Sequence, residues 1–151
     1  MKTFITISIL LVLAGCNPDG VGCFKSSGTI ETVSIVVPEF NVIDVSGNIE
    51  VHLFNKPTIE VSLTTGSNLI PGIRMEVVDG VLFLDNLNTC NWTRNYENPV
   101  LEISNPGITK IMQRGSGEII GMEMLTYDQL ILENKFGSGD FILGVNVRRL
   151  D

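Results

Sequence analysis

The sequence is poor in the residues on which most catalytic and metal-binding chemistry depends. Its 151 residues include one histidine, one tryptophan and three cysteines, and 10 lysines and arginines stand against 17 aspartates and glutamates. The resulting formal charge of −7 argues against binding to nucleic acid and against docking by charge on anionic lipid. Because no cysteine and histidine cluster has the spacing of a zinc site, we expect neither a metal ion nor another cofactor.

Long apolar runs are also lacking. The longest, Phe4–Leu13, is shorter than the roughly 20 residues that cross a bilayer as a helix. It follows Lys2 and ends in Leu13-Ala14-Gly15-Cys16, which resembles a bacterial lipobox, in which the cysteine becomes the lipidated first residue. An ordinary signal peptide with an incidental cysteine is the alternative. We therefore predict a lipoprotein signal peptide over residues 1–15, lipidation at Cys16, and a tether over residues 16–27.

This interpretation also predicts the cellular location of the protein. Lipidation implies a cell-envelope location, with the outer membrane favoured and the periplasmic or surface face left open. The membrane is then a partner only through the N-terminal lipid.

Helical periodicity is almost absent, and strand patterns fill the chain from Gly28 onward. Apolar and polar residues alternate in Ile59–Thr64, as in a strand with one buried face. Asp79-Gly80 separates two apolar runs and predicts a tight antiparallel hairpin. The short segment Met122–Gln129 is the one helix candidate, and we expect it to be a loop.

One sequence pattern occurs twice between residues 108 and 143. Ile108–Ile120 and Leu130–Ile142 match at an offset of 22, and a weaker copy lies at Phe40–Val51. A period of this length, with strands and glycine turns, is typical of stacked rungs. We predict an all-β domain over residues 28–151, a β-helix-like solenoid with rungs of about 20–22 residues preceded by an antiparallel hairpin. A β-sandwich is the alternative. Because Val145–Asp151 resembles the opening of another rung, we expect the domain to be truncated at its C-terminus.

The two copies share a turn motif, Gly-Ser-Gly followed by an acid. We expect the glycines to take a positive φ at a tight corner and the acids to lie about 4.8 Å apart on neighbouring strands. Paired acids at that spacing can hold calcium or cleave glycosides, but a purely structural turn is favoured. The residues of the motif are Gly115, Ser116, Gly117 and Glu118, and then Gly137, Ser138, Gly139 and Asp140.

A polar stretch, residues 86–98, interrupts the strand pattern. Beyond Cys16 only Cys23 and Cys90 remain, and in an exported protein two cysteines most often form a disulfide. A metal pair or two free thiols are the alternatives. Trp92, Arg94 and Tyr96 alternate along the stretch and could form a binding patch, although a tryptophan lid over the end of the core is favoured.

His52 is the one candidate for a general base. It lies two residues after Glu50 in a predicted strand, but a catalytic base also needs a nucleophile nearby. A histidine on the strand surface is the favoured interpretation.

Several of these segments together resemble a known family. Phe40–Val51, the Asp79-Gly80-Val81-Leu82 hairpin and the recurring Gly-Ser-Gly-Asp/Glu turns are similar to the family described as "putative auto-transporter adhesin, head GIN domain". The resemblance implies exported, often lipidated proteins, common in Bacteroidetes, with a β-helix-like fold and no established enzyme activity. Cys23-Phe-Lys-Ser and Cys90-Asn-Trp-Thr-Arg resemble a cysteine-paired subgroup of this family.

We therefore predict a lipid-anchored, non-enzymatic envelope protein with a role in adhesion, binding or envelope structure. A protein or a glycan is a possible ligand whose identity the sequence leaves open, and nucleic acid is not expected. A polysaccharide-active enzyme on a β-helix scaffold is the alternative, and convergence of Glu118 and Asp140 with another polar group in a groove would distinguish it.

Overall fold

The computed structural model describes residues 26–88 and 97–151, and within them the strands form two six-stranded sheets. The first sheet has the spatial order β1 (Ile30–Ser34), β4 (Glu60–Gly66), β7 (Val100–Ser104), β3 (Glu50–Phe54), β9 (Ile119–Gly121) and β11 (Phe141–Ile142). The second has the order β12 (Val145–Leu150), β10 (Leu125–Asn134), β8 (Lys110–Gln113), β2 (Val42–Val45), β6 (Val81–Asn86) and β5 (Ile73–Val78). A short 3-10 turn, η2 (Ile70–Gly72), connects β4 to β5.

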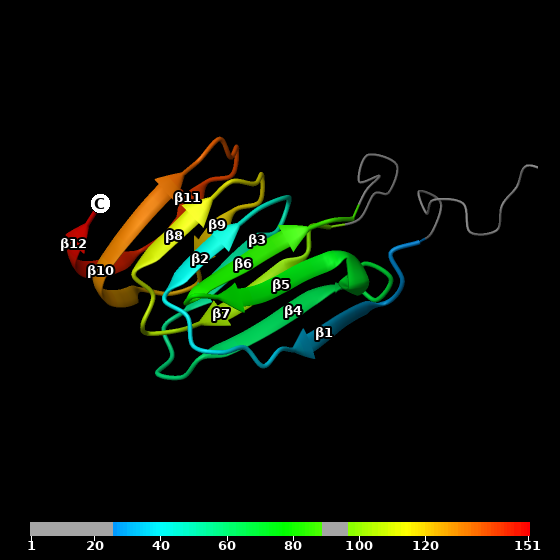
Figure 1. Ribbon diagram of the computed structural model, residues 1–151, viewed down its shortest axis with the longest axis horizontal. Coiled ribbons are helices and arrows are strands. Elements are labelled where there is room, and N and C mark those ends of the chain that lie inside the picture. Colours follow the sequence, from blue (N-terminus) through cyan, green and yellow to red (C-terminus); the bar gives the residue numbers. More distant parts are fainter. Residues whose placement is uncertain (1–25, 89–96) are drawn as a thin grey trace, which may run out of the picture.

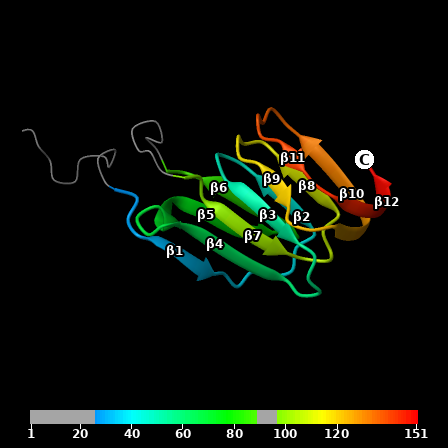
Figure 2. The same ribbon diagram turned by 180° about the vertical axis from the view of Figure 1, so that it is seen from behind.

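The prediction of a β-solenoid is wrong. Both sheets are mixed: β1, β4 and β7 pair antiparallel in the first sheet, as do β5 and β6 in the second, whereas the remaining pairs are parallel. Strand order within each sheet does not follow the chain, since β2 lies between β6 and β8. Neither sheet closes on itself, and the two lie face to face as two layers (Figure 1), as the view from behind also shows (Figure 2). This arrangement agrees with the sandwich alternative.

The core lies between the two sheets because each strand buries alternate residues. In β3 the side chains of Val51 and Leu53 are buried, while those of the residues between and beside them reach the outer face. In β2 the two side chains that belong to the core are those of Ile43 and Val45. The buried side chains of both sheets form one cluster, to which Tyr127 of β10 also belongs. A continuous apolar core of this kind makes the outer faces a rigid support for side chains.

The predicted Asp79-Gly80 hairpin is present between β5 and β6. Val78 pairs with Val81 across it, and both turn residues have positive φ, 50° for Asp79 and 76° for Gly80. These values are typical of the type I′ turn, whose twist matches that of the adjoining strands.

The segment expected to be a loop, Met122–Gln129, is partly strand. Residues from Leu125 onward belong to β10, where the side chains of Leu125 and Tyr127 are buried and that of Thr126 is exposed. The end of the chain likewise forms a full strand, because β12 pairs in parallel with β10 from Val145 onward.

Candidate functional site

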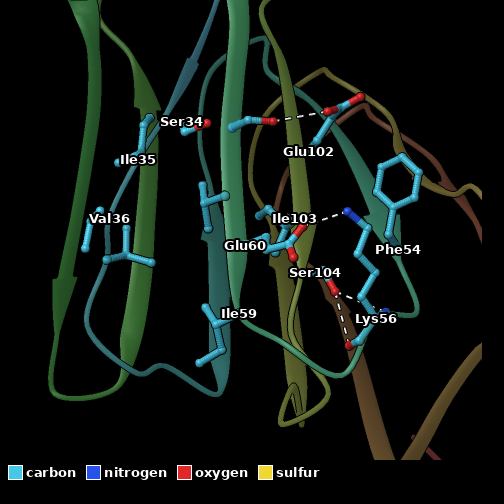
Figure 3. Close-up of a pocket in the computed structure, with 13 residues that line it drawn as sticks. Ser34, Ile35, Val36, Phe54, Lys56, Ile59, Glu60, Glu102, Ile103 and Ser104 are labelled. Carbon is cyan, nitrogen blue, oxygen red and sulfur yellow. Dashed lines mark hydrogen bonds and ion pairs between the residues drawn. The ribbon is translucent and has the colours of Figure 1, made fainter.

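A hollow lies on the outer face of the first sheet, beside β1, where the chain leaves that strand. It has a volume of about 610 Å³, within the range of small-molecule sites. We call it the outer groove; Figure 3 shows its residues. Its lining consists of Ser34, Ile35, Val36, Val37, Phe54, Lys56, Ile59, Glu60, Val61, Ser62, Glu102, Ile103 and Ser104.

Sheet register brings the polar floor of the groove together. Ser62 of β4 is the partner of Glu102 of β7, and the Ser62 hydroxyl donates a hydrogen bond of 3.1 Å to Glu102 Oε2. Ser34 of β1 is the partner of Ser62 on its other side. Since all three side chains come from alternate positions that face away from the core, the floor offers hydroxyl and carboxylate groups to solvent.

A charged pair crosses the groove. Lys56 Nζ donates a hydrogen bond of 2.7 Å to Glu60 Oε2, as drawn in Figure 3. This bond, with a second one from Thr58, lowers the pKa of the Glu60 carboxyl, and the same bond raises the pKa of the Lys56 ammonium. Both side chains are about half exposed, so the pair contributes little to stability but fixes the position of its charges.

The rim of the groove is apolar. The side chain of Val36 is fully exposed and that of Ile59 is 38% exposed. The ring of Phe54 lies under Lys56, with 5.7 Å between Nζ and the ring centroid, a distance at which a cation is attracted to an aromatic face. The groove therefore combines exposed apolar side chains with an excess of carboxylates.

His52 is paired with Glu50 on the same outer face. His52 Nε2 lies 2.6 Å from Glu50 Oε1, and both side chains are partly buried. No hydroxyl or thiol is hydrogen-bonded to His52 within residues 26–88 and 97–151. Its register partner on β7 is another acid, Glu102. The pair lacks the nucleophile of an acid–base relay, which agrees with a surface histidine.

The repeated turns lie next to one another at one end of the sheets. Ser116 N donates to Gly47 O at 2.9 Å, and Ser138 N donates to Gly115 O at 3.0 Å. The two copies and the weaker third copy around Gly47 are thus stacked, as the sequence repeat predicted.

The expected positive φ is wrong for all four motif glycines. Positive-φ glycines among the described residues are Gly28, Gly47 and Gly80. Gly117 is needed for close approach instead, because a Cβ on it would lie 1.8 Å from the carbonyl oxygen of Ile49. On Gly139 a Cβ would lie 1.9 Å from the oxygen of Gly117. Gly115 and Gly137 face the preceding turn in the same manner.

Glu118 and Asp140 lie directly after these turns, one residue before the neighbouring strands β9 and β11 begin. The register of Ile119 with Phe141 places them side by side, and both side chains are exposed. Neither lines the outer groove or the smaller hollow on the second sheet. No group of three or more potential metal ligands occurs within the described residues. The acids therefore do not converge with another polar group, as a glycosidase or calcium site requires.

Several predicted residues lie outside the described ranges. These are the lipidation residue Cys16, the cysteines Cys23 and Cys90, and the possible patch of Trp92, Arg94 and Tyr96. Their roles stay predictions. Within the described residues, no helix is long and apolar enough to cross a membrane.

The outer groove itself was missed at the sequence level. Glu60, Ser62 and Glu102 occupy the polar positions of alternating strands, a signal that assigns them to the solvent face. That signal does not show that β4 and β7, about 40 residues apart along the chain, are neighbours in the sheet.

Fold and groove together define an all-β domain of two facing sheets with an open groove on one outer face. The sequence pattern that defines the family described as "putative auto-transporter adhesin, head GIN domain" matches residues 39–151, and the chain belongs to this family.

Solved structures of similar fold come from species of Bacteroides and Parabacteroides. A crystal structure described as a putative adhesin from Bacteroides fragilis is 27% identical, with a TM-score of 0.68, and the match covers 81% of this chain and 56% of that one. A structure described as a putative lipid binding protein from Parabacteroides distasonis has 18% identity, a TM-score of 0.68, and coverage of 83% and 54%. A putative adhesin from Parabacteroides merdae has 18% identity, a TM-score of 0.59, and coverage of 72% and 45%.

The chain thus spans about half the length of these solved relatives. The two less similar structures support the fold alone. No functionally curated protein matches the chain.

Proposed function

We propose that this protein is a lipid-anchored, non-enzymatic component of the cell envelope that binds other proteins in the manner of an adhesin. Membership of the adhesin family and the likeness to the Bacteroides fragilis protein support a binding role in the envelope. The observation that carries the proposal is the outer groove, an open surface with an apolar rim and a charged floor on a rigid sheet.

The chemistry of the groove favours a basic, partly apolar protein segment. Val36 and Ile59 give exposed apolar contacts at the rim, which are typical of protein-binding surfaces. Glu60 and Glu102 give two carboxylates against the single ammonium of Lys56. A ligand with a lysine or arginine next to an apolar side chain satisfies both parts of this surface.

Peptide selection tests this groove. A displayed library of random peptides is selected on the purified mature protein and then compared on Val36→Asp and Ile59→Asp variants. We expect enrichment of basic, apolar peptides that lose at least about tenfold in affinity on the variants, which corresponds to about 1.4 kcal/mol. The matched control is Ile142→Asp, because Ile142 is 51% exposed on β11 of the same sheet, outside the groove lining. Peptides that bind all three variants equally, or a preference for acidic peptides, would contradict the proposal.

Lipid attachment through Cys16 is tested separately. Cys16→Ser removes the thiol that receives the lipid, so we expect unprocessed precursor or soluble protein instead of mature protein in the membrane fraction. A variant that still fractionates with membranes in the mature form would show that the anchor is something else.

The acidic residues and the histidine on which the enzyme alternative depended are not arranged as a catalytic site. Glu118 and Asp140 are exposed outside the outer groove, and His52 is paired with Glu50 without a nucleophile.

A further inference from the structure

The second sheet holds a buried carboxylate whose hydrogen bonding is incomplete. Asp44 lies on the outer face of β2, yet its side chain is only 3% exposed. Asp44 Oδ2 accepts a hydrogen bond of 2.6 Å from Arg114 Nη2, whereas Asp44 Oδ1 has no partner among the described residues. A buried carboxylate oxygen without a donor is costly to maintain, and a bound ligand that donates a hydrogen bond would remove this cost.

Asp44 lines a hollow of about 290 Å³ on this face, close to the lower limit of small-molecule sites. Parallel pairing of β2 with β6 places Phe83 directly beside Asp44. Antiparallel pairing of β5 with β6 makes Arg74 and Asp85 neighbours, and both side chains also line the hollow. We call it the Asp44 hollow.

Some carboxylate oxygens of the hollow form no ion pair with the arginines beside them. Arg74 pairs with Glu76 instead of with Asp85, and Asp85 takes part in no ion pair among the described residues. Arg114 is 47% exposed where it covers Asp44, so its outer part can turn toward solvent and admit a ligand. With Arg114 turned aside, the hollow offers acceptors on Asp44, Asp85 and Glu76, guanidinium donors on two arginines, and an aromatic side chain.

We propose that the Asp44 hollow binds one neutral sugar ring of a glycan. A pyranose carries several hydroxyls that donate to carboxylates and accept from guanidinium groups, and its apolar C–H face packs on an aromatic ring such as that of Phe83. A metal ion fits less well, because the described residues contain no group of three potential metal ligands. An anionic ligand is disfavoured by Asp44 and Asp85. This site is separate from the outer groove, on the other sheet.

Free monosaccharides are the probes for the test. The detergent-solubilised mature protein is titrated with glucose, galactose, mannose, N-acetylglucosamine and sialic acid, and binding is followed by saturation-transfer NMR. We expect saturable binding of at least one neutral sugar and weaker binding of sialic acid, which carries a carboxylate. Asp44→Asn should weaken the bound sugar at least about tenfold, since a charge-assisted hydrogen bond becomes a neutral one.

Matched variants separate loss of contact from loss of fold. Asp128→Asn is the control, because Asp128 is 93% exposed on β10 of the same sheet and lies outside the Asp44 hollow. Asp85→Asn is the second variant, at a half-buried edge of the hollow, and should weaken the sugar while the melting temperature stays within a few degrees.

The remaining outcomes are decisive in the other direction. Absence of saturable binding by every sugar, or equal affinities for the wild-type, Asp44→Asn and Asp85→Asn proteins, would overturn the assignment. Because Val36→Asp changes only the outer groove, it should leave sugar binding intact, and a failure of peptide selection would not affect this result.

Discussion

Replacement of Gly117 by alanine is the sharpest test of how the turns are packed. A Cβ at this position would lie 1.8 Å from the carbonyl oxygen of Ile49 and 2.3 Å from its carbon. These are backbone atoms held by the sheet, because Val51 N donates to Glu118 O at 2.9 Å just beyond them. The added methyl group cannot be accommodated by a side-chain rotation, so one turn must move away from the other.

The magnitude follows from two opposing effects. Alanine at a position that tolerates it stabilises by roughly 0.4–1 kcal/mol, through a smaller entropy of the unfolded chain. Overpacking against a well-ordered neighbour costs roughly 1–3 kcal/mol, and more when backbone must shift. With an approach this short, overpacking should win, and we expect Gly117→Ala to lower the free energy of unfolding by about 2–3 kcal/mol.

Gly144→Ala is the matched control. The nearest atoms to its added Cβ are the flexible end of Met124, at 3.6 Å and 3.7 Å, which is ordinary contact. Urea unfolding followed by circular dichroism should give a lower midpoint for Gly117→Ala with an unchanged slope, and a midpoint for Gly144→Ala close to that of the wild type. Free energies for the two variants within about 0.5 kcal/mol of each other would refute close packing as the reason for the glycine.

Three further predictions concern other parts of the chain. If Cys23 and Cys90 are bonded, both should resist thiol labelling until the protein is reduced, and prompt labelling of the native protein would refute the disulfide. Phe136 has a φ of 64°, so Phe136→Gly should raise the free energy of unfolding by about 1 kcal/mol; a lower urea midpoint would show that the phenyl ring contributes to folding. Burial raises the pKa of Tyr127 to about 12, above its ordinary value of 10, so the neutral phenol stabilises the fold fully below pH 10 and this contribution is lost as the pH rises toward 12. Tyr127→Phe should therefore lose less stability over that range, and identical alkaline profiles would contradict this.

Local patterns in the sequence predicted local structure well. The Asp79-Gly80 pair predicted its hairpin because type I′ geometry needs positive φ at both positions, and the structure has it. That the Gly-Ser-Gly turns lie next to one another is also consistent with the sequence, because both copies have the same spacing from the apolar pair that follows. In contrast, Met122–Gln129 was expected to be a loop, although Leu125, Thr126 and Tyr127 alternate between buried and exposed positions as in a strand.

The order of the strands in the two sheets could not be predicted from local sequence patterns. The repeat covers β8 to β11, and a continued repeat would give a solenoid. However, β4 and β5 run antiparallel to their neighbours, and no repeated motif marks them. The central place of β2, between β6 and β8, is a long-range pairing that depends on the total packing of the core. For the same reason, the outer groove and the Asp44 hollow could not be predicted, because the strands that carry their residues are far apart in the sequence.

The two copies of the repeat differ in length at the turn that contains Phe136. Gln113 and Asn134 are register partners of β8 and β10, and each accepts a hydrogen bond of 3.0 Å from the amide of its glycine, Gly115 or Gly137. Gln113 and Gly115 are two residues apart in the sequence, whereas Asn134 and Gly137 are three residues apart. The later turn therefore contains one extra residue.

The backbone accommodates that extra residue at Phe136, which takes the left-handed conformation and leaves its side chain fully exposed. Glycine or asparagine is the usual choice at such a position, and burial gives the phenylalanine no compensation. Because β9 and β11 stay in register beyond it, the insertion does not spread into the first sheet. The stacked turns therefore tolerate a change of length at their outer tip, while the glycines that face the neighbouring turn cannot change.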